Sequence, residues 1–408
     1  MKIFIINIVI FLCIIIDSAI SWRFKGKERS PVILIPGDGG SQVEAKLNKT
    51  IVPHYLCEKT SDYFNIWLNL ELLVPIIIDC FIDNMKLIYH NDTRTTTNTA
   101  GVDIRIPGWG DPLSVEYLDP SKASPGSYFK DIGNMLVNDM GYVRNLSLRG
   151  APYDFRKAPN ENEEFFVKLK ALVEETYIMN NKQPVTLIAH SMGGPMTLIF
   201  LQRQSQKWKD VFINSLITLG AVWGGSVKAL KVFAIGDNLG AYVLRESILK
   251  DQQITSPSLG WLLPSKLFWK DNEILVQTQL KNYTLLDLEQ FFNDINVPNG
   301  WEFRKDTEKY QEDFTAPGVE VHCLHGAKVG TVERLYYKPG VTVDGYPLLI
   351  LGDGDGTVNS RSLEGCLHWQ GKQKQKIYHQ PFSGVDHMEI LRNTNILDYI
   401  KTILTVAT

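Results

Sequence analysis

A short apolar run near the middle of the chain leads straight into a tight turn, and a helical pattern follows. The run is residues 185–189 (Val-Thr-Leu-Ile-Ala) and the turn is residues 190–194 (His-Ser-Met-Gly-Gly). β-Branched and aliphatic residues favour a strand. A serine squeezed between strand and helix needs small neighbours two positions away, and Ala189 and Gly193 supply them in a variant of Gly-x-Ser-x-Gly. The pattern predicts that Ser191 is a nucleophile, although an ordinary turn with a capping serine also fits it.

The composition describes a globular protein that enters the secretory pathway. Hydrophobic residues make up 44% and charged residues 21%, and the net charge of −3 argues against nucleic-acid binding, which needs a basic face. Lys2, an apolar run to Ile16 and small residues at 18–21 predict a signal peptide over residues 1–21. The run is too short for a typical membrane span, but an uncleaved anchor is the alternative.

Glycosylation sequons and cysteines support export. Four Asn-x-Ser/Thr sequons lie at Asn48, Asn91, Asn145 and Asn282. Cys13 would leave with the signal peptide, and the remaining cysteines are Cys57, Cys80, Cys323 and Cys366. An even number suits two disulfides in an oxidising compartment. Four cysteines allow three pairings, and proximity in sequence favours Cys57 with Cys80 and Cys323 with Cys366.

The sequence predicts no metal and no cofactor. It has no Cys-x-x-Cys and no histidine cluster at zinc-ligand spacing. The glycine-rich segment 37–40, after a predicted strand at 31–36, lacks the spacing of nucleotide-binding loops. In a hydrolase, such a loop instead offers backbone N–H groups to an oxyanion.

A serine hydroxyl needs a base, and His387 has the most suitable surroundings. It lies in a glycine-containing loop between a predicted strand at 375–379 and a helical pattern that begins at Glu389. His190 is next to the serine, but successive residues at such an elbow point apart, so we expect a structural role for it. A surface histidine without an acid partner would be the simpler interpretation of His387.

An orienting acid should lie between the serine and the histidine in the sequence. The apolar run 348–351 ends in residues 352–359 (Gly-Asp-Gly-Asp-Gly-Thr-Val-Asn), which contain Asp353 and Asp355. Spacing does not choose between the two aspartates. A calcium loop is disfavoured, because Leu351 and Ser362 would occupy its first and last ligand positions.

The order of elements predicts an α/β-hydrolase with a mostly parallel sheet. Predicted strands at 31–36, 185–189 and 212–219 alternate with helical patterns such as 165–177. Residues 63–78 are unusually apolar, and flanking cysteines with a proline break favour a compact cap, which is either core or a lipid-binding surface. Glycines and aromatic residues between 223 and 271 suit a mobile lid or an extra helical layer.

Together these motifs resemble the lecithin:cholesterol acyltransferase family, most closely its lysosomal phospholipase A2 (group XV) branch. The resemblance covers nearly the whole mature chain. It is carried by Ile35–Asp38, Glu44–Leu47, Ile66–Asn69, Gly150–Asp154, Ala189–Gly193, Trp223–Gly225 and Gly354–Val358. Asp38 and Ala189 are like the lysosomal branch, because the sterol-esterifying enzyme has cysteine and glycine at these places.

The resemblance implies roles for individual residues. Ser191 would be the nucleophile, His387 the base and Asp355 the orienting acid. The backbone amides of Asp38 and Met192 would form the oxyanion hole. The resemblance implies the same two disulfides, and it assigns the segment with Trp67, Leu68, Leu70 and Leu72 to membrane binding. Residues 22–408 would form one hydrolase domain with a membrane-binding cap at about 54–85 and a cap and lid region at about 223–320.

The function that follows is a secreted or lysosomal serine phospholipase A and O-acyltransferase. It would pass an acyl group from a phospholipid to water or to a lipid alcohol such as ceramide. Its expected partners are a phospholipid surface and the lipid acceptor, with no obligate protein partner. A sterol acyltransferase and a catalytically silent lipid-binding protein are the alternatives. Two explanations would account for activity in an acidic compartment. Protonated carboxylates and histidines would make the net charge positive and attract the protein to anionic lipid, or protonation of Asp38 would remove a negative charge from the oxyanion site.

Overall fold

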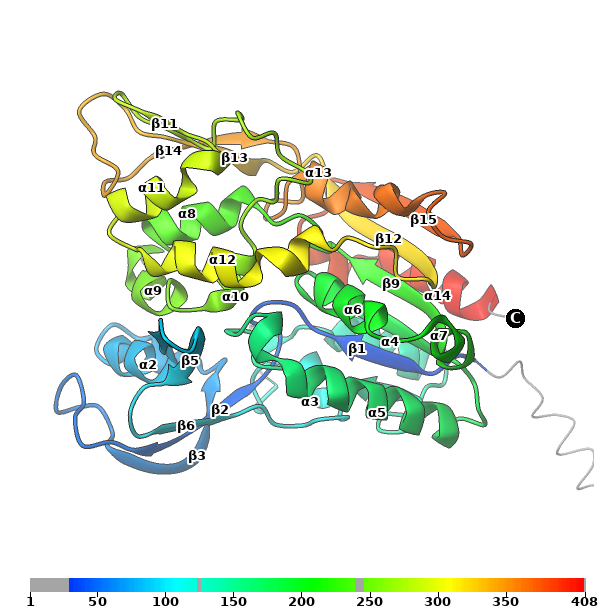
Figure 1. Cartoon of the computed structure of the whole chain (residues 1–408). Helices are drawn as coiled ribbons and strands as arrows, with labels where there is room; N and C mark the ends of the chain where they lie inside the picture. Colours follow the sequence, from blue (N-terminus) through cyan, green and yellow to red (C-terminus); the bar gives the residue numbers. More distant parts are fainter. Residues whose placement is uncertain (1–28, 123–125, 239–245, 407–408) are drawn as a thin grey trace, which may run out of the picture.

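A six-stranded sheet forms the centre of the computed structural model (Figure 1). Its order is β15-β12-β9-β8-β1-β7, and every pairing is parallel. The strands are β1 (Val32–Ile35), β7 (Leu148–Gly150), β8 (Val185–His190), β9 (Ile213–Leu219), β12 (Glu320–Ala327) and β15 (Ile377–Ser383). The prediction of a mostly parallel α/β-hydrolase sheet is therefore confirmed.

The structure describes residues 29–122, 126–238 and 246–406. The expected signal peptide, residues 1–21, lies outside the described residues. Among the described residues, no helix combines the length and the apolar character needed to cross a membrane.

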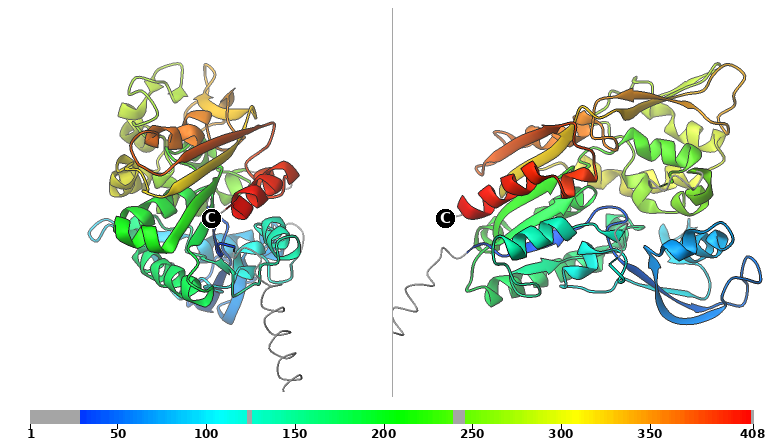
Figure 2. Two further views of the ribbon diagram at one scale, coloured as in Figure 1. Left: turned by 90° about the vertical axis from the view of Figure 1, so that its right-hand side faces the viewer. Right: turned by 180° about the vertical axis from the view of Figure 1, so that it is seen from behind.

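Helices cover both faces of the sheet, and the alternation of side chains along β1 explains why. Ile33 and Ile35 point into one apolar core, and Val32 and Leu34 point into another. The first core is covered by α5 (Glu163–Met179) and α6 (Gly193–Gln202), and the second by α4 (Lys130–Asn138) and α14 (Thr394–Val406). Figure 2 shows α14 and α4 together on the rear face. The short helix α3 (Leu113–Glu116) packs beside α4 and β7, and α7 (Gln206–Phe212) packs beside α5 and β9.

The expected lid region forms a subdomain with a sheet and a core of its own. The sheet has the order β11-β10-β13-β14. Its strands are β10 (Val276–Gln277), β11 (Asn282–Tyr283), β13 (Thr331–Tyr336) and β14 (Leu348–Gly352), so two of them come from beyond residue 320. The associated helices are α8 (Val227–Ile235), α9 (Glu246–Gln253), α10 (Pro257–Trp261), α11 (Leu288–Asp294), α12 (Asn299–Glu312) and α13 (Ser360–Leu363). Residues 239–245 of the expected lid lie outside the described residues.

The expected membrane-binding cap lies next to the lid subdomain (Figure 1). It has a three-stranded sheet in the order β3-β2-β6 and a hairpin of β4 and β5. These strands are β2 (Val43–Asn48), β3 (Thr60–Trp67), β4 (Leu87–His90), β5 (Thr95–Asn98) and β6 (Val102–Arg105), and helix α2 (Ile78–Met85) packs beside them. A disulfide joins Cys57 to Cys80, and a second joins Cys323 to Cys366, so both predicted pairings are confirmed.

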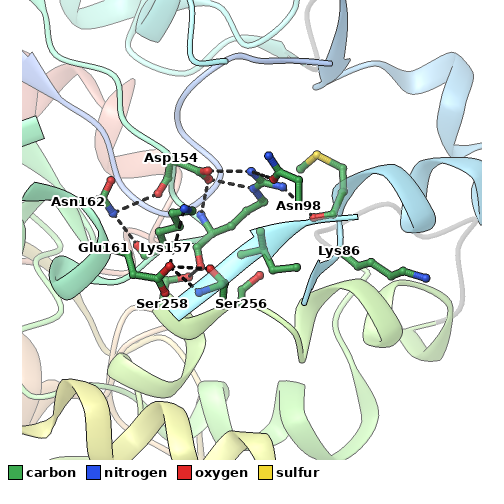
Figure 3. A network of polar contacts seen from close by, with 12 residues as sticks. Lys86, Asn98, Asp154, Lys157, Glu161, Asn162, Ser256 and Ser258 are labelled. Carbon is green, nitrogen blue, oxygen red and sulfur yellow. Dashed lines mark hydrogen bonds and ion pairs between the residues drawn. The ribbon is translucent and has the colours of Figure 1, made fainter. Parts of the chain in front are cut away.

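One buried arginine connects the hydrolase core with both insertions. The Arg156 side chain is buried and donates hydrogen bonds to Asp154, to Asn98 of β5 and to the carbonyl of Met85 at the end of α2. Its own carbonyl accepts hydrogen bonds from the amide and hydroxyl of Ser258 in α10. Figure 3 shows how Asp154, Asn98 and Ser258 converge on this point. The cap and the lid therefore share one fixed anchor.

Candidate active site

Ser191 lies at the apex of the turn between β8 and α6. Its φ of +55° is a left-handed conformation that costs energy for a non-glycine residue. The turn is possible because its neighbours are small: a Cβ on Gly193 would lie 2.5 Å from the Pro36 carbonyl oxygen, and one on Gly37 would lie 2.5 Å from the Ser191 Cβ. The strand, turn and helix that the sequence predicts are therefore present, and they hold the hydroxyl at the end of the sheet.

Three polar side chains form a continuous chain of contacts from this serine into the protein. His387 Nε2 lies 2.9 Å from Ser191 Oγ, and His387 Nδ1 lies 2.6 Å from Asp355 Oδ2. The backbone amide of His387 also donates to the Asp355 carbonyl at 2.8 Å. Gly220, which follows β9, leaves room for this arrangement, because a Cβ there would lie 3.1 Å from His387 Nδ1. The serine thus contacts a base, and the base contacts an acid, which is the arrangement that acyl transfer by a serine requires.

Asp355, and not Asp353, is the aspartate in contact with His387. Asp353 is exposed and accepts a hydrogen bond from the Lys328 amide, whereas Asp355 is fully buried. Asp355 Oδ1 accepts from the amides of Thr357 and Val358 at 3.1 and 2.8 Å. Burial by itself would raise the pKa of Asp355, but His387 and these amides hold the pKa below its ordinary value. The carboxylate therefore stays charged in mild acid.

The loop after β1 brings Gly37 against Ser191, and Asp38 is the next residue of that loop. The two backbone amides that the resemblance assigns to the oxyanion hole belong to Asp38, which follows Gly37, and to Met192, which precedes the first residue of α6. Asp38 is exposed at the surface, and desolvation by the neighbouring protein raises its pKa to about 6. Lys228 of α8 and the Gly39 amide oppose this rise. Asp38 is thus neutral in mild acid and charged at neutral pH.

A buried relay, which the sequence does not indicate, links the Asp38 loop to the His387 loop. The Gly37 amide donates to the Tyr128 hydroxyl at 3.0 Å, and Tyr128 donates to His190 Nδ1. His190 Nε2 then donates to the His387 carbonyl at 2.9 Å. Burial and the charge of His387 lower the pKa of His190 to about 3, so the ring keeps one tautomer even in acid. His190 has the structural position that the elbow geometry predicts.

Trp67 is buried, in contrast to the exposed position that direct contact with lipid requires. Only 8% of its surface is exposed, and its ring lies 5.8 Å from that of Phe155. Its Nε1 donates to the Gly39 carbonyl at 2.8 Å, so Trp67 supports the loop that carries Asp38. Of the four predicted residues, Leu70 is exposed, and the other exposed apolar side chains on and beside the cap are Ile51, Tyr55, Leu56, Val74, Ile76 and Ile88. Leu68 and Leu72 are half-buried.

The structure also places the predicted glycosylation sites and the start of the expected lid. The four sequon asparagines, Asn48, Asn91, Asn145 and Asn282, are all exposed. Trp223, at the start of the lid region, is buried against Trp369, with ring centroids 4.8 Å apart. The Gly224 amide donates to the Ser362 hydroxyl at 2.8 Å. The lid region is therefore anchored firmly where it leaves the central sheet.

Comparison with protein families identifies the relationship that these features suggest. The family model of lecithin:cholesterol acyltransferase matches residues 63–394, which is most of the chain. The chain belongs to the lecithin:cholesterol acyltransferase family. Its expected membership is confirmed, and the matched range includes Ser191, Asp355 and His387.

Relatives within this family divide into two groups. The lysosomal phospholipase A and acyltransferase of Homo sapiens is 48% identical over 375 residues, covering 92% of this chain and 90% of that protein. The phosphatidylcholine-sterol acyltransferase of Gallus gallus is 43% identical over 362 residues, covering 88% and 87%. Among solved structures, a chain of the Tle4–Tli4 complex is similar with a TM-score of 0.59 at 14% identity. It covers 93% of this chain and 99% of that chain, a likeness of fold alone.

Proposed function

We propose that this protein is a serine phospholipase A and O-acyltransferase that acts through an acyl-enzyme on Ser191. The observation that carries the proposal is the unbroken chain of contacts from Ser191 through His387 to Asp355. Family membership and the identity to lysosomal phospholipase A and acyltransferase support phospholipid as the acyl donor. The higher identity to that enzyme than to the sterol acyltransferase favours this function over sterol esterification.

The reaction proceeds in two steps. His387 Nε2 takes the Ser191 proton while Oγ bonds to the acyl carbon, and the carbonyl oxygen becomes an oxyanion that faces the amides of Asp38 and Met192. The ester bond to the glycerol oxygen then breaks, and the His387 proton passes to this leaving oxygen, which releases a lysophospholipid. In the second step, His387 deprotonates water or a lipid hydroxyl, whose oxygen bonds to the acyl carbon. The bond between that carbon and Ser191 Oγ then breaks, and the proton on His387 passes to Oγ, which restores the serine.

The cap supplies the contact with a phospholipid surface in this proposal. Leu70, Val74 and Ile76 are exposed on the segment around α2, and the Cys57–Cys80 disulfide holds the loop with Tyr55 and Leu56 against that helix. Exposed aliphatic and aromatic side chains gain free energy when they enter the interface of a bilayer. The insertion that begins at Trp223 would act as the lid over the acyl chain.

An acidic compartment of the secretory pathway is the proposed place of action. The predicted signal peptide at 1–21, the exposed sequon asparagines and the two disulfides support export. The raised pKa of Asp38 supports acid activity, since the neutral carboxyl does not repel the oxyanion. Retention in lysosomes and secretion are both compatible with these features.

Product analysis on defined liposomes tests the proposal. Phosphatidylcholine vesicles containing a ceramide are incubated with the glycosylated protein at acidic and neutral pH, and the lipids are identified by mass spectrometry. We expect lysophospholipid with free fatty acid and acylceramide, more in acid, and little sterol ester when cholesterol replaces the ceramide. Sterol ester as the main product would favour the alternative, and the absence of lysophospholipid would refute the proposal.

A further inference from the structure

Two histidines and a glutamate from separate segments meet on one face of the central sheet. His325 belongs to β12, His379 to β15, and Glu364 begins the 3-10 helix Glu364–Trp369 that crosses this face. Their ligand atoms all lie within 4.8 Å of one another. The sequence predicts no such cluster, because the three residues lie far apart along the chain.

The fold itself explains why the three side chains meet. His379 pairs with Cys323 across the parallel strands, and Cys323 is two residues before His325, so both histidines point to the same side of the sheet. The Cys323–Cys366 disulfide fixes the short helix over that side, two residues after Glu364. The cluster is thus positioned by strand register and by a covalent bond.

The hydrogen bonds of His325 and His379 leave one ring nitrogen of His325 with its lone pair directed into the cluster. His325 is buried and its Nδ1–H donates to the Gly326 carbonyl at 2.7 Å, so its Nε2 carries the lone pair. His379 Nε2 lies 2.7 Å from this atom and donates its proton to it. A ring whose other N–H is held by a backbone carbonyl is the usual arrangement of a metal-binding histidine.

We propose that His325, His379 and Glu364 bind a zinc ion. Two imidazoles and one carboxylate are a set of ligands that suits Zn²⁺, with solvent as the fourth ligand. On binding, the His379 proton moves from Nε2 to Nδ1, and the ion replaces the hydrogen bond between the rings. Zinc–nitrogen bonds of about 2.1 Å in tetrahedral geometry require the two nitrogens to be about 3.4 Å apart, so the rings separate by roughly 0.7 Å.

The site is separate from the proposed acyl-transfer chemistry but is connected to it through the sheet. Strand β15 is the edge strand, and it ends at Ser383, four residues before His387. An ion held by β12, β15 and the short helix fastens this edge strand. We therefore expect zinc to raise the unfolding temperature, independently of whether Ser191 is active.

Zinc titration of the whole glycosylated protein at neutral pH tests the site by calorimetry and thermal unfolding. Wild type should bind one equivalent of Zn²⁺, and His379→Gln and Glu364→Gln should each weaken binding at least tenfold. His90→Gln, a change of a histidine on β4, is the matched control and should bind like wild type. His325→Gln should also lose zinc binding; if this variant fails to fold, His379→Gln and Glu364→Gln still test whether the cluster binds the ion. No zinc binding by wild type, or unchanged binding in His379→Gln, would overturn the proposal.

Discussion

The Nε2 of His190 lies 2.9 Å from the carbonyl oxygen of His387 and donates a hydrogen bond to it. The residue next to the proposed nucleophile thus holds the loop of the proposed base. Tyr128 connects His190 Nδ1 to the Gly37 amide on the other side of Ser191. The loops that carry Asp38 and His387 therefore both depend on the His190 tautomer that is protonated on Nε2.

Removal of the Tyr128 hydroxyl should lower kcat. In Tyr128→Phe, the buried His190 Nδ1 has no hydrogen-bond donor, which costs about 1–3 kcal/mol. Part of this cost lowers the free energy of unfolding, and part allows the loops of Asp38 and His387 to move. We expect a fall in kcat of about tenfold with little change in KM on a soluble ester. Tyr142→Phe is the control, because its buried hydroxyl donates to the Ser30 carbonyl away from Ser191. An equal fall in both variants would mean that Tyr128 acts only through stability.

Asp38→Asn should extend activity to neutral pH. Since the pKa of Asp38 is about 6, its carboxyl is neutral below that pH and gains a repulsive charge as pH rises through it. We therefore expect wild-type activity to fall by about an order of magnitude or more as the pH rises from ~5 to ~7.5. Asparagine cannot ionise, so the variant should lose this part of the decline. The pH profile on a soluble short-chain ester is the measurement, and identical profiles would exclude the explanation.

A charge on the exposed edge of the cap should weaken membrane binding. Ile76 is 68% exposed, and burial of such a side chain in lipid contributes about 1.5–3 kcal/mol, so Ile76→Asp should reduce vesicle binding about ten- to hundredfold. Hydrolysis of a soluble ester should not change. Leu280→Asp provides the comparison, because Leu280 is 94% exposed on the turn between β10 and β11, outside the cap. Equal losses in both variants would disprove a specific role for the cap.

Arg156→Ala should destabilise the protein strongly. The substitution leaves Asp154 Oδ2 and the Met85 carbonyl without the donors that the guanidinium supplies, which typically costs about 3–5 kcal/mol. By contrast, Arg203→Ala breaks an exposed ion pair with Glu163 and should cost no more than about 1 kcal/mol. Thermal unfolding of the two variants distinguishes these values. A similar small shift in both would show that Arg156 is not the anchor of the cap and the lid.

Local sequence patterns predict the parts of this molecule that depend on local geometry. The turn around Ser191 needs small residues at fixed positions, and the loop with His387 follows a strand, so both are visible in the sequence. Pairing each cysteine with the nearest other cysteine in the sequence also predicts the two disulfides correctly. Such features predict the parallel sheet and the order of Ser191, Asp355 and His387.

Contacts between distant segments are not visible in the same way. Tyr128 meets His190 from 62 positions away, and His325 meets His379 across two strands. An apolar pattern also cannot distinguish core from surface: Trp67 is buried, whereas the apolar run Leu348–Leu351 is exposed on the edge strand of the lid sheet. These positions follow from tertiary packing, which a pattern in one segment does not contain.

Capture of the acyl-enzyme tests the central claim most directly. Wild type and Ser191→Ala are mixed with phosphatidylcholine vesicles in acid, quenched rapidly and digested for mass spectrometry. The account predicts a fatty-acyl adduct on the peptide that contains Ser191 in wild type, and neither adduct nor lysophospholipid in the variant, which should still bind vesicles. Lysophospholipid formation by Ser191→Ala, or an acyl adduct on a different residue, would contradict it.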